Sequence, residues 1–210
     1  MITFCTTAMP RPDIVEATYK SFSNNIKDLD LKEQRLLLNI DPVSSGDLDS
    51  DIEETKEVAR RYFGEVIVNV PEKPNFTAAV DWCWTTANTE FVFHLEDDWE
   101  LRQAINIGEI ISNMRSNGYM QTILRAYTYT YSKLVLSPSI IHRDYYSRFA
   151  GEFDYDVNPE IQLRKPFVDK KKIFVAGKNP IVFDLGRAWL KGQPFKKPSM
   201  KGEFTEWEQK

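Results

Sequence analysis

The chain has little cysteine and no long apolar run. Cys5 and Cys83 are its two cysteines, and their separation does not match the spacing of metal ligands. We therefore expect two reduced thiols in the core. No segment is long and apolar enough to span a membrane, and the strand-like start, Ile2–Thr6, does not resemble a signal peptide. These absences predict a cytoplasmic protein.

The chain also lacks an excess of positive charge. Its 27 lysines and arginines are outnumbered by 31 aspartates and glutamates, which gives a net charge of −4. This balance excludes a protein whose whole surface binds nucleic acid, although it leaves room for a local basic strip. Internal repeats and clear linkers are missing too, and 42% hydrophobic residues suffice for one core. We expect a single domain over residues 1–210, with halves 1–100 and 101–210.

Strands and helices alternate strictly in the first half. The predicted strands are apolar along their whole length, as in a parallel sheet covered by helices on both faces. Strands are expected at 2–6, 34–40, 65–70 and 91–95, and helices at 13–25, 51–63 and 75–87. This pattern predicts an α/β fold with a mostly parallel central sheet.

The second half is less regular. Helices are expected at 101–116, 140–149 and 158–163, strands at 121–126 and 133–136, and a hairpin or paired strands at 173–176 and 180–184. We expect this half to add a smaller region to the sheet of the first half.

Three consecutive carboxylates, Glu96-Asp97-Asp98, follow the fourth predicted strand. Such charges cannot stay in an apolar interior without a partner, and carboxylate oxygens suit Mg²⁺ or Mn²⁺. Ligands of α/β sheets also bind at the carboxyl ends of the strands. The run therefore predicts a metal site for a phosphate-bearing substrate. The alternative is that the acids favour the N-terminus of the helix expected near Leu101.

Together, three features of the sequence resemble GT-A glycosyltransferases of the family 2 type, especially small phage-type members. The Pro10-Arg11-Pro12 loop follows the first strand, and Asp41 ends the second. Residues 73–82, KPNFTAAVDW, resemble the N-x-x-x-A-x-N helix of that family, and Glu96-Asp97-Asp98 takes the place of its DxD motif. The resemblance implies a GT-A, Rossmann-like fold. In it, 1–100 is the nucleotide-sugar-binding half, and 101–210 is the acceptor-side half with the C-terminal tail.

The sequence departs from the family pattern at three points. Glu96 replaces the first aspartate of DxD, and Asp81 stands where the family often has asparagine. The Gln-x-x-Arg-Trp motif of processive members is absent, and residues 186–189, GRAW, are only a distant echo of it. The last departure favours a single hexosyl or pentosyl transfer over polymerisation.

The resemblance also implies a set of site residues for a nucleotide-diphosphate sugar, most specifically a UDP-sugar. Metal binding is implied for Asp98, with Glu96 and Asp184; binding of the nucleotide-sugar is implied for Thr6, Thr7, Arg11, Asp41, Lys73, Asn75, Glu96, Asp97 and Arg187. Ordinary turn chemistry is the alternative for Asp41-Pro42 and Lys73-Pro74-Asn75, and a helix N-cap is the alternative for Asp184.

A direct displacement needs a base that takes the proton of the acceptor hydroxyl. Residues 158–164, NPEIQLR, resemble the family segment that supplies it, which implies Glu160. Glu152, Asp154 and Asp156 compete for this role, and the whole stretch also fits a solvated acidic loop. Asp98 is expected to contribute to catalysis through the metal.

The acceptor is left open by the sequence. Basic and aromatic residues are interleaved in the second half, as in proteins that hold a nucleic-acid strand. They are Arg125, Tyr127, Tyr129, Tyr131, Arg143, Tyr145, Tyr146, Arg148, Arg164, Lys165, Lys170, Lys171, Lys172, Lys196 and Lys197. The phage-type resemblance implies a hydroxymethylated pyrimidine in DNA, in a host cytoplasm, whereas a glycan or small molecule fits equally.

Two other classes of protein share parts of this pattern. A nucleotidyltransferase has a similar α/β half and acidic site, but residues 7–11 lack the glycines of its phosphate loop. A non-catalytic nucleotide-binding module is the other alternative.

Overall fold

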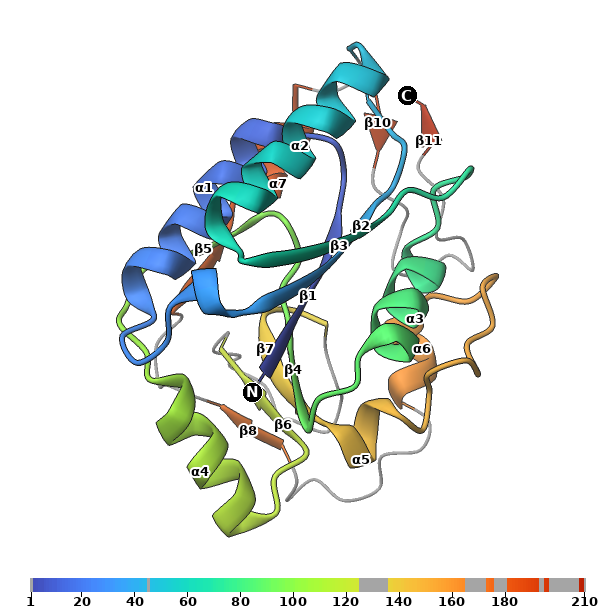
Figure 1. The fold of residues 1–210 in the computed structure, drawn as a ribbon. Coiled ribbons are helices and arrows are strands. Elements are labelled where there is room, and N and C mark those ends of the chain that lie inside the picture. Colours follow the sequence, from blue (N-terminus) through green and yellow to red (C-terminus); the bar gives the residue numbers. More distant parts are fainter. Residues whose placement is uncertain are drawn as a thin grey trace.

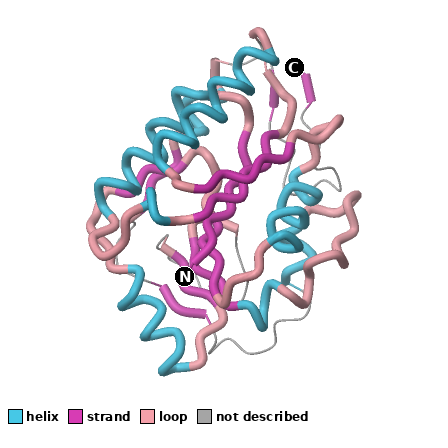
Figure 2. The backbone as a smooth tube through the Cα atoms, viewed as in Figure 1, coloured by secondary structure: helices cyan, strands magenta, loops and turns pink. Residues whose placement is uncertain are grey.

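The computed structural model describes residues 2–44, 46–124, 136–164, 173–175, 181–192, 195–196 and 208–209. Its centre is a seven-stranded sheet in the order β3-β2-β1-β4-β7-β6-β8, which twists through the molecule between two layers of helices (Figures 1 and 2). The strands are β1 (Ile2–Ala8), β2 (Arg35–Ile40), β3 (Glu65–Asn69), β4 (Phe91–His94), β6 (Gln121–Ile123), β7 (Ser139–His142) and β8 (Ile173–Val175).

The direction of the strands divides the sheet. The pairs β1·β2, β2·β3 and β1·β4 are parallel, as the strand–helix alternation predicts. The strand β7 runs antiparallel to both β4 and β6, whereas β8 runs parallel to β6. The predicted α/β fold with a mainly parallel central sheet is confirmed, and both halves of the chain contribute strands to it.

Helices cover both faces of the sheet. On one face lie α1 (Pro12–Asn25), α2 (Leu48–Tyr62) and α4 (Ile107–Asn117), and on the other lie α3 (Phe76–Thr86), α5 (Arg143–Tyr146) and α6 (Pro159–Arg164) (Figure 1). Alternate residues of the strands belong to the two hydrophobic cores, one on each face of the sheet. Phe4 stacks on Phe93 at 5.0 Å in the first core, and Cys5 and Trp84 belong to the second. Both cysteines are free and buried.

The helix predicted over 101–116 is wrong at its start. Trp99–Leu101 forms β5, which pairs antiparallel with β9 (Val182–Asp184), and α4 begins only at Ile107. Trp99 and Leu101 are buried on either side of half-exposed Glu100, which is the two-residue period of a strand. The first amides of α4 have another partner, because the Asp28 carboxylate accepts hydrogen bonds from the backbone amides of Ile107 and Gly108. The acids at 96–98 therefore do not cap this helix.

Two more predictions in the second half need correction. The segment predicted as a helix over 140–149 begins with β7, because Ile140 and Ile141 bury their side chains on opposite faces of the sheet. The strands near 173 and 180–184 exist, but β8 pairs with β6 and β9 pairs with β5, so they do not form a hairpin with each other. Residues 133–135 of the strand predicted over 133–136 lie outside the described residues.

The remaining elements are short. They are the 3₁₀ helix η1 (Leu31–Glu33), the helix α7 (Gly186–Leu190) and the two-stranded pair β10 (Phe195–Lys196) with β11 (Glu208–Gln209). Among the described residues, no helix combines the length and the apolar character that crossing a membrane requires.

Candidate active site

The carboxyl ends of β1, β2 and β4 bring three separate loops together. These strands are neighbours and parallel, so the chain leaves them at the same edge of the sheet. Arg11 follows β1, Asp41 follows β2, and the acidic run at 96–98 follows β4. The sequence places all three groups at this edge, and the structure confirms that location.

Arg11 and Asp97 form a buried ion pair where the loops after β1 and β4 meet, and we call this place the acidic corner. The Arg11 Nε and Nη2 atoms lie 2.8 Å and 2.7 Å from the two carboxylate oxygens of Asp97, and the Met9 amide donates to Asp97 Oδ2 at 3.1 Å. Burial alone would lower the pKa of Arg11, but the Asp97 and Asp98 carboxylates raise it above its ordinary value. Burial raises the pKa of Asp97, and Arg11 acts against that by stabilising the charged form. A guanidinium that stays charged implies an ionised partner. Asp97 therefore fastens the end of β4 to the end of β1, which favours a structural role over direct contact with a donor.

Asp98 faces both Arg11 and the helix α7. Its Oδ2 accepts a hydrogen bond from Arg11 Nη2 at 2.9 Å, and its side chain keeps 15% of its surface exposed. Its backbone oxygen accepts from the Leu185 amide at 2.8 Å. A Cβ atom at Gly186 would lie 2.0 Å from Asp98 Oδ2, so only glycine permits this approach. Asp98 is thus held on two sides and remains partly open.

Asp184, from the second half of the chain, lies at the same corner. It pairs in register with Trp99 in the β5·β9 ribbon, which places it beside the backbone of the acidic run. Its Oδ1 accepts from the Arg187 amide at 3.1 Å, and its Oδ2 forms an ion pair with Arg187 Nε at 3.0 Å. The bond to the Arg187 amide is the kind that the N-cap alternative implies, and it leaves the carboxylate partly exposed.

The other members of the acidic run are engaged differently. Glu96 Oε2 accepts from the indole Nε1 of Trp99 at 2.8 Å. Trp99 itself is 4% exposed, so it is a core residue rather than a platform for a sugar. His94 lies just before the acids and is fully buried, and burial lowers its pKa to about 4. Neither ring nitrogen has a hydrogen-bond partner among the described residues, which argues against His94 as a ligand or a packed hydrogen-bonding residue.

Asp41 directly follows β2, at the carboxyl end of that strand. It is 6% exposed, and its Oδ1 accepts a hydrogen bond from Asn39 Nδ2 at 2.9 Å. Burial raises its pKa to about 6, while the Asn39 side chain and the Asn75 backbone act in the opposite direction. Thr7 is also nearly buried, and Thr6 is fully buried, so the Thr6 side chain is not accessible to a nucleotide.

Asn75 and Lys73 precede α3. Asn75 is the N-cap of α3, because its Oδ1 accepts from the Ala78 amide at 2.9 Å, and its Nδ2 donates to the Tyr155 carbonyl at 3.1 Å. These two bonds give the turn alternative for Asn75 a concrete basis. Lys73 is exposed in the loop before it.

Asp81 of α3 holds the segment that carries three of the acids predicted to lie on the acceptor side. Asp81 accepts hydrogen bonds from the Gly151 amide at 2.6 Å and from the Tyr155 hydroxyl at 2.7 Å, so the departure from the family's asparagine has a structural use. Glu160 Oε1 accepts from the Leu136 amide at 3.0 Å. The competing acids Glu152, Asp154 and Asp156 are exposed in the segment that Asp81 holds.

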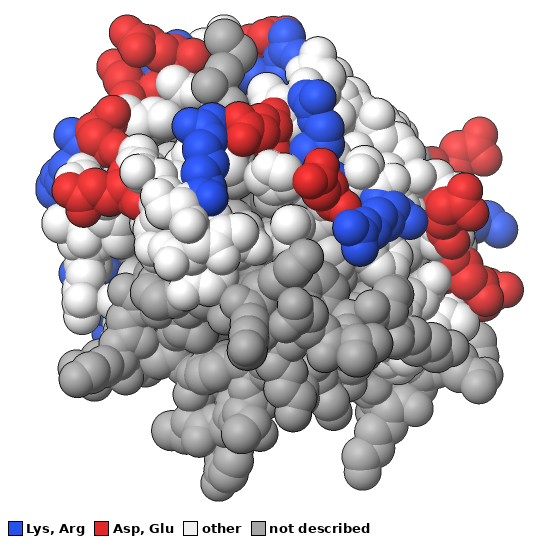
Figure 3. Space-filling model, turned by 90° about the horizontal axis from the view of Figure 1, so that it is seen from below, with Lys and Arg blue, Asp and Glu red and all other residues white. Residues whose placement is uncertain are grey.

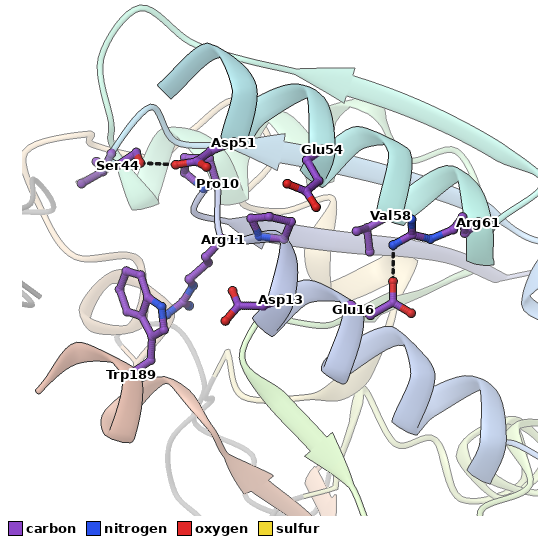
Figure 4. Close-up of a pocket in the computed structure, with 12 residues that line it drawn as sticks. Pro10, Arg11, Asp13, Glu16, Ser44, Asp51, Glu54, Val58, Arg61 and Trp189 are labelled. Carbon is purple, nitrogen blue, oxygen red and sulfur yellow. Dashed lines mark hydrogen bonds and ion pairs between the residues drawn. The ribbon is translucent and has the colours of Figure 1, made fainter. Parts of the chain in front are cut away.

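A pocket of about 510 Å³ opens beside Arg11 (Figure 4). Its walls are the start of α1, one face of α2 from Asp51 to Arg61, the loop at Val43 and Ser44, and Trp189 from α7. The guanidinium carbon of Arg11 lies 4.8 Å from the centre of the Trp189 ring. This contact joins residues 178 positions apart (189 − 11), and no pattern in the sequence indicates it. The pocket lies beside the predicted nucleotide residues, although Thr7, Asp41 and Asn75 do not line it.

Two carboxylates at this edge suit a divalent cation. No group of three potential ligands occurs within the described ranges. Mg²⁺, however, is usually held by one or two protein carboxylates together with substrate phosphates, and it keeps water ligands as well. Asp98 and Asp184 meet that requirement, since both are partly exposed at one corner. Asp97 does not, because Arg11 and Met9 already occupy its oxygens.

The predicted basic and aromatic strip is only partly described. Arg125, Tyr127, Tyr129, Tyr131, Lys165, Lys170, Lys171, Lys172 and Lys197, and the side chains of Arg164 and Lys196, lie outside the described residues. Tyr145 and Tyr146 are buried, so they cannot stack on bases. On the described part of one face, basic and acidic side chains are interspersed (Figure 3).

Comparisons with solved structures give the fold relatives of this chain. TarS from S. aureus matches with a TM-score of 0.59 and 10% identity, over 87% of this chain and 36% of TarS. The mannosyltransferase PcManGT from Pyrobaculum calidifontis, solved with GDP-Man and Mn²⁺, matches with a TM-score of 0.57 and 10% identity, over 83% of this chain and 56% of PcManGT.

A nucleotidyltransferase structure also matches. A putative glucose-1-phosphate thymidylyltransferase from Bacillus anthracis has a TM-score of 0.53 and 10% identity, over 95% of this chain and 98% of that one. No protein-family profile matches the sequence, and neither does any curated protein. At these identities the likeness concerns the fold alone: the chain has the GT-A type of α/β fold, which glycosyltransferases and nucleotidyltransferases share.

Proposed function

We propose that this protein is a glycosyltransferase that moves a sugar from a nucleotide-diphosphate sugar, specifically a UDP-sugar, to a hydroxyl acceptor. The observation that carries the proposal is the meeting of Arg11, Asp98 and Asp184 at the edge of the sheet that also holds Asp41. Fixed positive charge, partly open carboxylates and a nucleobase acceptor are the groups that a nucleotide-sugar requires there. Solved relatives with UDP, with UDP-GlcNAc and with GDP-Man support this choice of donor class.

Different residues of the corner would bind the diphosphate and the base. Cleavage of the sugar–phosphate bond leaves negative charge on the diphosphate, and Arg11 is a buried, permanently charged group close to Asp98. The two hydrogen bonds to Asp97 hold the Arg11 guanidinium in place, so the site needs little reorganisation when charge develops on the diphosphate. Asp41 would accept the N–H of a uracil ring at the end of β2.

Mg²⁺ or Mn²⁺ would be held by Asp98 and Asp184, and it would neutralise the diphosphate and act as a Lewis acid there. Asp98 is the principal ligand in this proposal, because its carboxylate stays partly exposed and its bond to Arg11 holds it in place. Glu96 would stay at the margin of the site, bound to Trp99. Arg187 would contact the diphosphate from the exposed side of Asp184.

Glu160 would take the proton of the acceptor hydroxyl. Its Oε1 already accepts the Leu136 amide, which holds the side chain in one orientation. A hydroxymethylated pyrimidine in DNA and a glycan are the two acceptor classes to test. Glu160→Gln should stop transfer to an acceptor, while slow hydrolysis of the donor continues.

A nucleotidyltransferase is the second candidate. The observation in its favour is that this chain spans 98% of the thymidylyltransferase relative but only 36% of TarS. Its phosphate loop normally carries glycines, and residues 7–11, TAMPR, have none.

Binding and turnover separate the candidates. The protein is incubated with UDP and with other nucleoside diphosphates, with and without Mn²⁺, and its melting temperature is recorded; a panel of nucleotide-sugars is then screened for slow hydrolysis. Metal-dependent stabilisation by UDP and release of UDP from one sugar donor are expected. Formation of pyrophosphate from a nucleoside triphosphate and a sugar phosphate would instead identify a nucleotidyltransferase, and indifference to every nucleotide would identify a non-catalytic module or another function.

A further inference from the structure

We infer that Asn39 and Asn69 form a side-chain relay that orients the Asp41 carboxylate and thereby selects a donor base with a ring N–H. The inference rests on the proposed function, because it assigns specificity to the same nucleotide site. Neither asparagine stands out in the sequence, since both lie inside predicted strands. The structure is what connects them to Asp41.

The relay crosses two neighbouring strands. Asn39 of β2 pairs in register with Asn69 of β3. Asn69 Nδ2 donates to Asn39 Oδ1 at 2.6 Å, and Asn39 Nδ2 donates to Asp41 Oδ1 at 2.9 Å. Because the Asn39 oxygen accepts from Asn69, its nitrogen must face Asp41. The relay therefore runs in one direction and ends on the carboxylate.

The relay matters for the charge of Asp41 because both Asn39 and Asp41 are buried. Asn39 is 1% exposed, and Asp41 is nearly as buried. A buried carboxylate needs hydrogen-bond donors to remain charged, and the Asn39 amide is one of the groups that stabilise its charged form. The backbone also fixes Asp41, since its amide donates to the Ala8 carbonyl at 2.8 Å. Asp41 is thus both oriented and kept available as an acceptor near neutral pH.

An ionised carboxylate can only accept hydrogen bonds. Uracil and thymine offer the N3–H group, and guanine offers N1–H, so each can donate to Asp41. Cytosine N3 and adenine N1 present a lone pair instead, which would face the carboxylate without a proton between them. Leaving such groups unpaired is the usual source of selectivity in a polar site. We expect nucleotides with a ring N–H to bind at least about tenfold more tightly than CDP or ADP.

The test measures dissociation constants by calorimetry at pH 7.5 with Mn²⁺, for UDP, TDP, GDP, CDP and ADP. Asn69→Ala removes the outer end of the relay at a half-buried position, so folding should be retained. Asn39→Ser removes the inner link, and Asn24→Ala, on the exposed end of α1, is the matched control. The UDP and GDP arms distinguish the two kinds of base that carry a ring N–H.

The relay predicts a change in selectivity rather than a general loss. Asn69→Ala and Asn39→Ser should weaken the preferred N–H nucleotide about three- to tenfold, leave CDP nearly unchanged and narrow the ratio between them. Asp41→Asn, which adds a donor, should shift the ratio further toward CDP. Unchanged ratios in both relay variants, with an unchanged melting temperature, would overturn the relay, as would a wild type that prefers CDP or ADP. A wild type that binds no nucleotide would overturn the proposed function together with the inference.

Discussion

The guanidinium of Arg11 donates hydrogen bonds to both carboxylate oxygens of Asp97, at 2.7 Å and 2.8 Å, although the two residues are 86 positions apart in the sequence. Both side chains are nearly excluded from solvent. The pair joins the loop after β1 to the loop after β4, and Arg11 extends from it to Asp98. The position of the proposed metal ligand therefore depends on a pair that does not bind the metal.

Breaking this pair should destabilise the protein strongly. Arg11→Met leaves the Asp97 carboxylate buried without its partner, and such a change typically costs about 3–5 kcal/mol in the free energy of unfolding. The double variant Arg11→Met/Asp97→Leu should recover much of that loss, because no buried charge remains. Urea denaturation measures both. Arg35→Met is the control: it removes an ion pair to Glu65 that is partly exposed, for which less than about 1 kcal/mol is expected. Similar losses in Arg11→Met and Arg35→Met would contradict the account.

Gly186→Ala should separate α7 from the acidic corner. The new methyl group would overlap Asp98 Oδ2, to which an ideal Cβ lies only 2.0 Å away. We expect at least about tenfold weaker Mn²⁺ binding by electron paramagnetic resonance, along with a changed environment of Trp189 in fluorescence. Gly192→Ala is the matched control, because its Cβ would meet only the Trp189 carbonyl, at 3.7 Å. Equal Mn²⁺ affinity in the two variants would show that the close approach has no part in metal binding.

Binding of UDP should weaken in mild acid. Burial raises the pKa of Asp41 to about 6, and the nearby Asp97 charge adds to the rise; Asn39 and the Asn75 backbone oppose it. Among the described residues, the buried Cys83 thiol also interacts with Asp41, and burial raises the pKa of this thiol further from neutrality. Because the ionised Asp41 carboxylate accepts the base N–H more strongly than the protonated carboxyl group does, UDP affinity should fall as the pH drops through 6.

The same group affects stability with the opposite trend. Its pKa in the folded protein lies above the ordinary value of 3.8, so the folded state binds more protons between about pH 4 and 6. The contribution of Asp41 to stability should therefore decrease as the pH rises through this window. Asp41→Asn should remove both pH effects, and a UDP affinity that stays flat from pH 7.5 to 5 in the wild type would contradict the assigned role.

Asp81→Asn should loosen the segment around Gly151 and Tyr155, which Asp81 holds. An asparagine can accept from the Gly151 amide through its oxygen and donate to the Tyr155 oxygen through its NH₂ group, but both bonds then lose the charged acceptor that strengthens them. We expect a loss of about 1–3 kcal/mol in the free energy of unfolding. Tyr155→Phe removes only the hydroxyl and should cost less. A double-mutant cycle with Asp81→Asn and Tyr155→Phe measures the coupling, and strictly additive losses would contradict a direct bond.

The first half of the fold could be predicted because its strands are apolar throughout and its helices carry clear end signals. Asn75 illustrates this, since a cap residue announces its helix locally. The second half could not be predicted in the same way. Trp99–Leu101 becomes a strand only because Val182–Asp184 lies beside it, and β7 is a strand because it fills the space between β4 and β6. Such partners are distant in sequence, and a short apolar run fits either a helix or a strand.

The candidate site follows the same division. The order of the strands was enough to place Arg11, Asp41 and Asp98 at one edge of the sheet, because the loops of parallel strands meet there, whereas their roles were implied by the family resemblance and stay predictions. Pairing within the edge was not predictable: nothing in the sequence says that Arg11 takes Asp97 rather than a ligand, or that Trp189 covers Arg11. Thr6 was placed in the site from its position, whereas the alternation of β1 turns it into the core.

Hydrolysis of a nucleotide-sugar tests the central claim most directly. Release of UDP from each UDP-sugar is measured with Mn²⁺ and with EDTA, for the wild type, Asp98→Asn and the control Glu100→Gln, whose carboxylate pairs with Arg102 at the surface. The account predicts hydrolysis that requires Mn²⁺, disappears in Asp98→Asn and persists in Glu100→Gln. Equal hydrolysis by Asp98→Asn and the wild type, or equal rates with Mn²⁺ and EDTA, would contradict it.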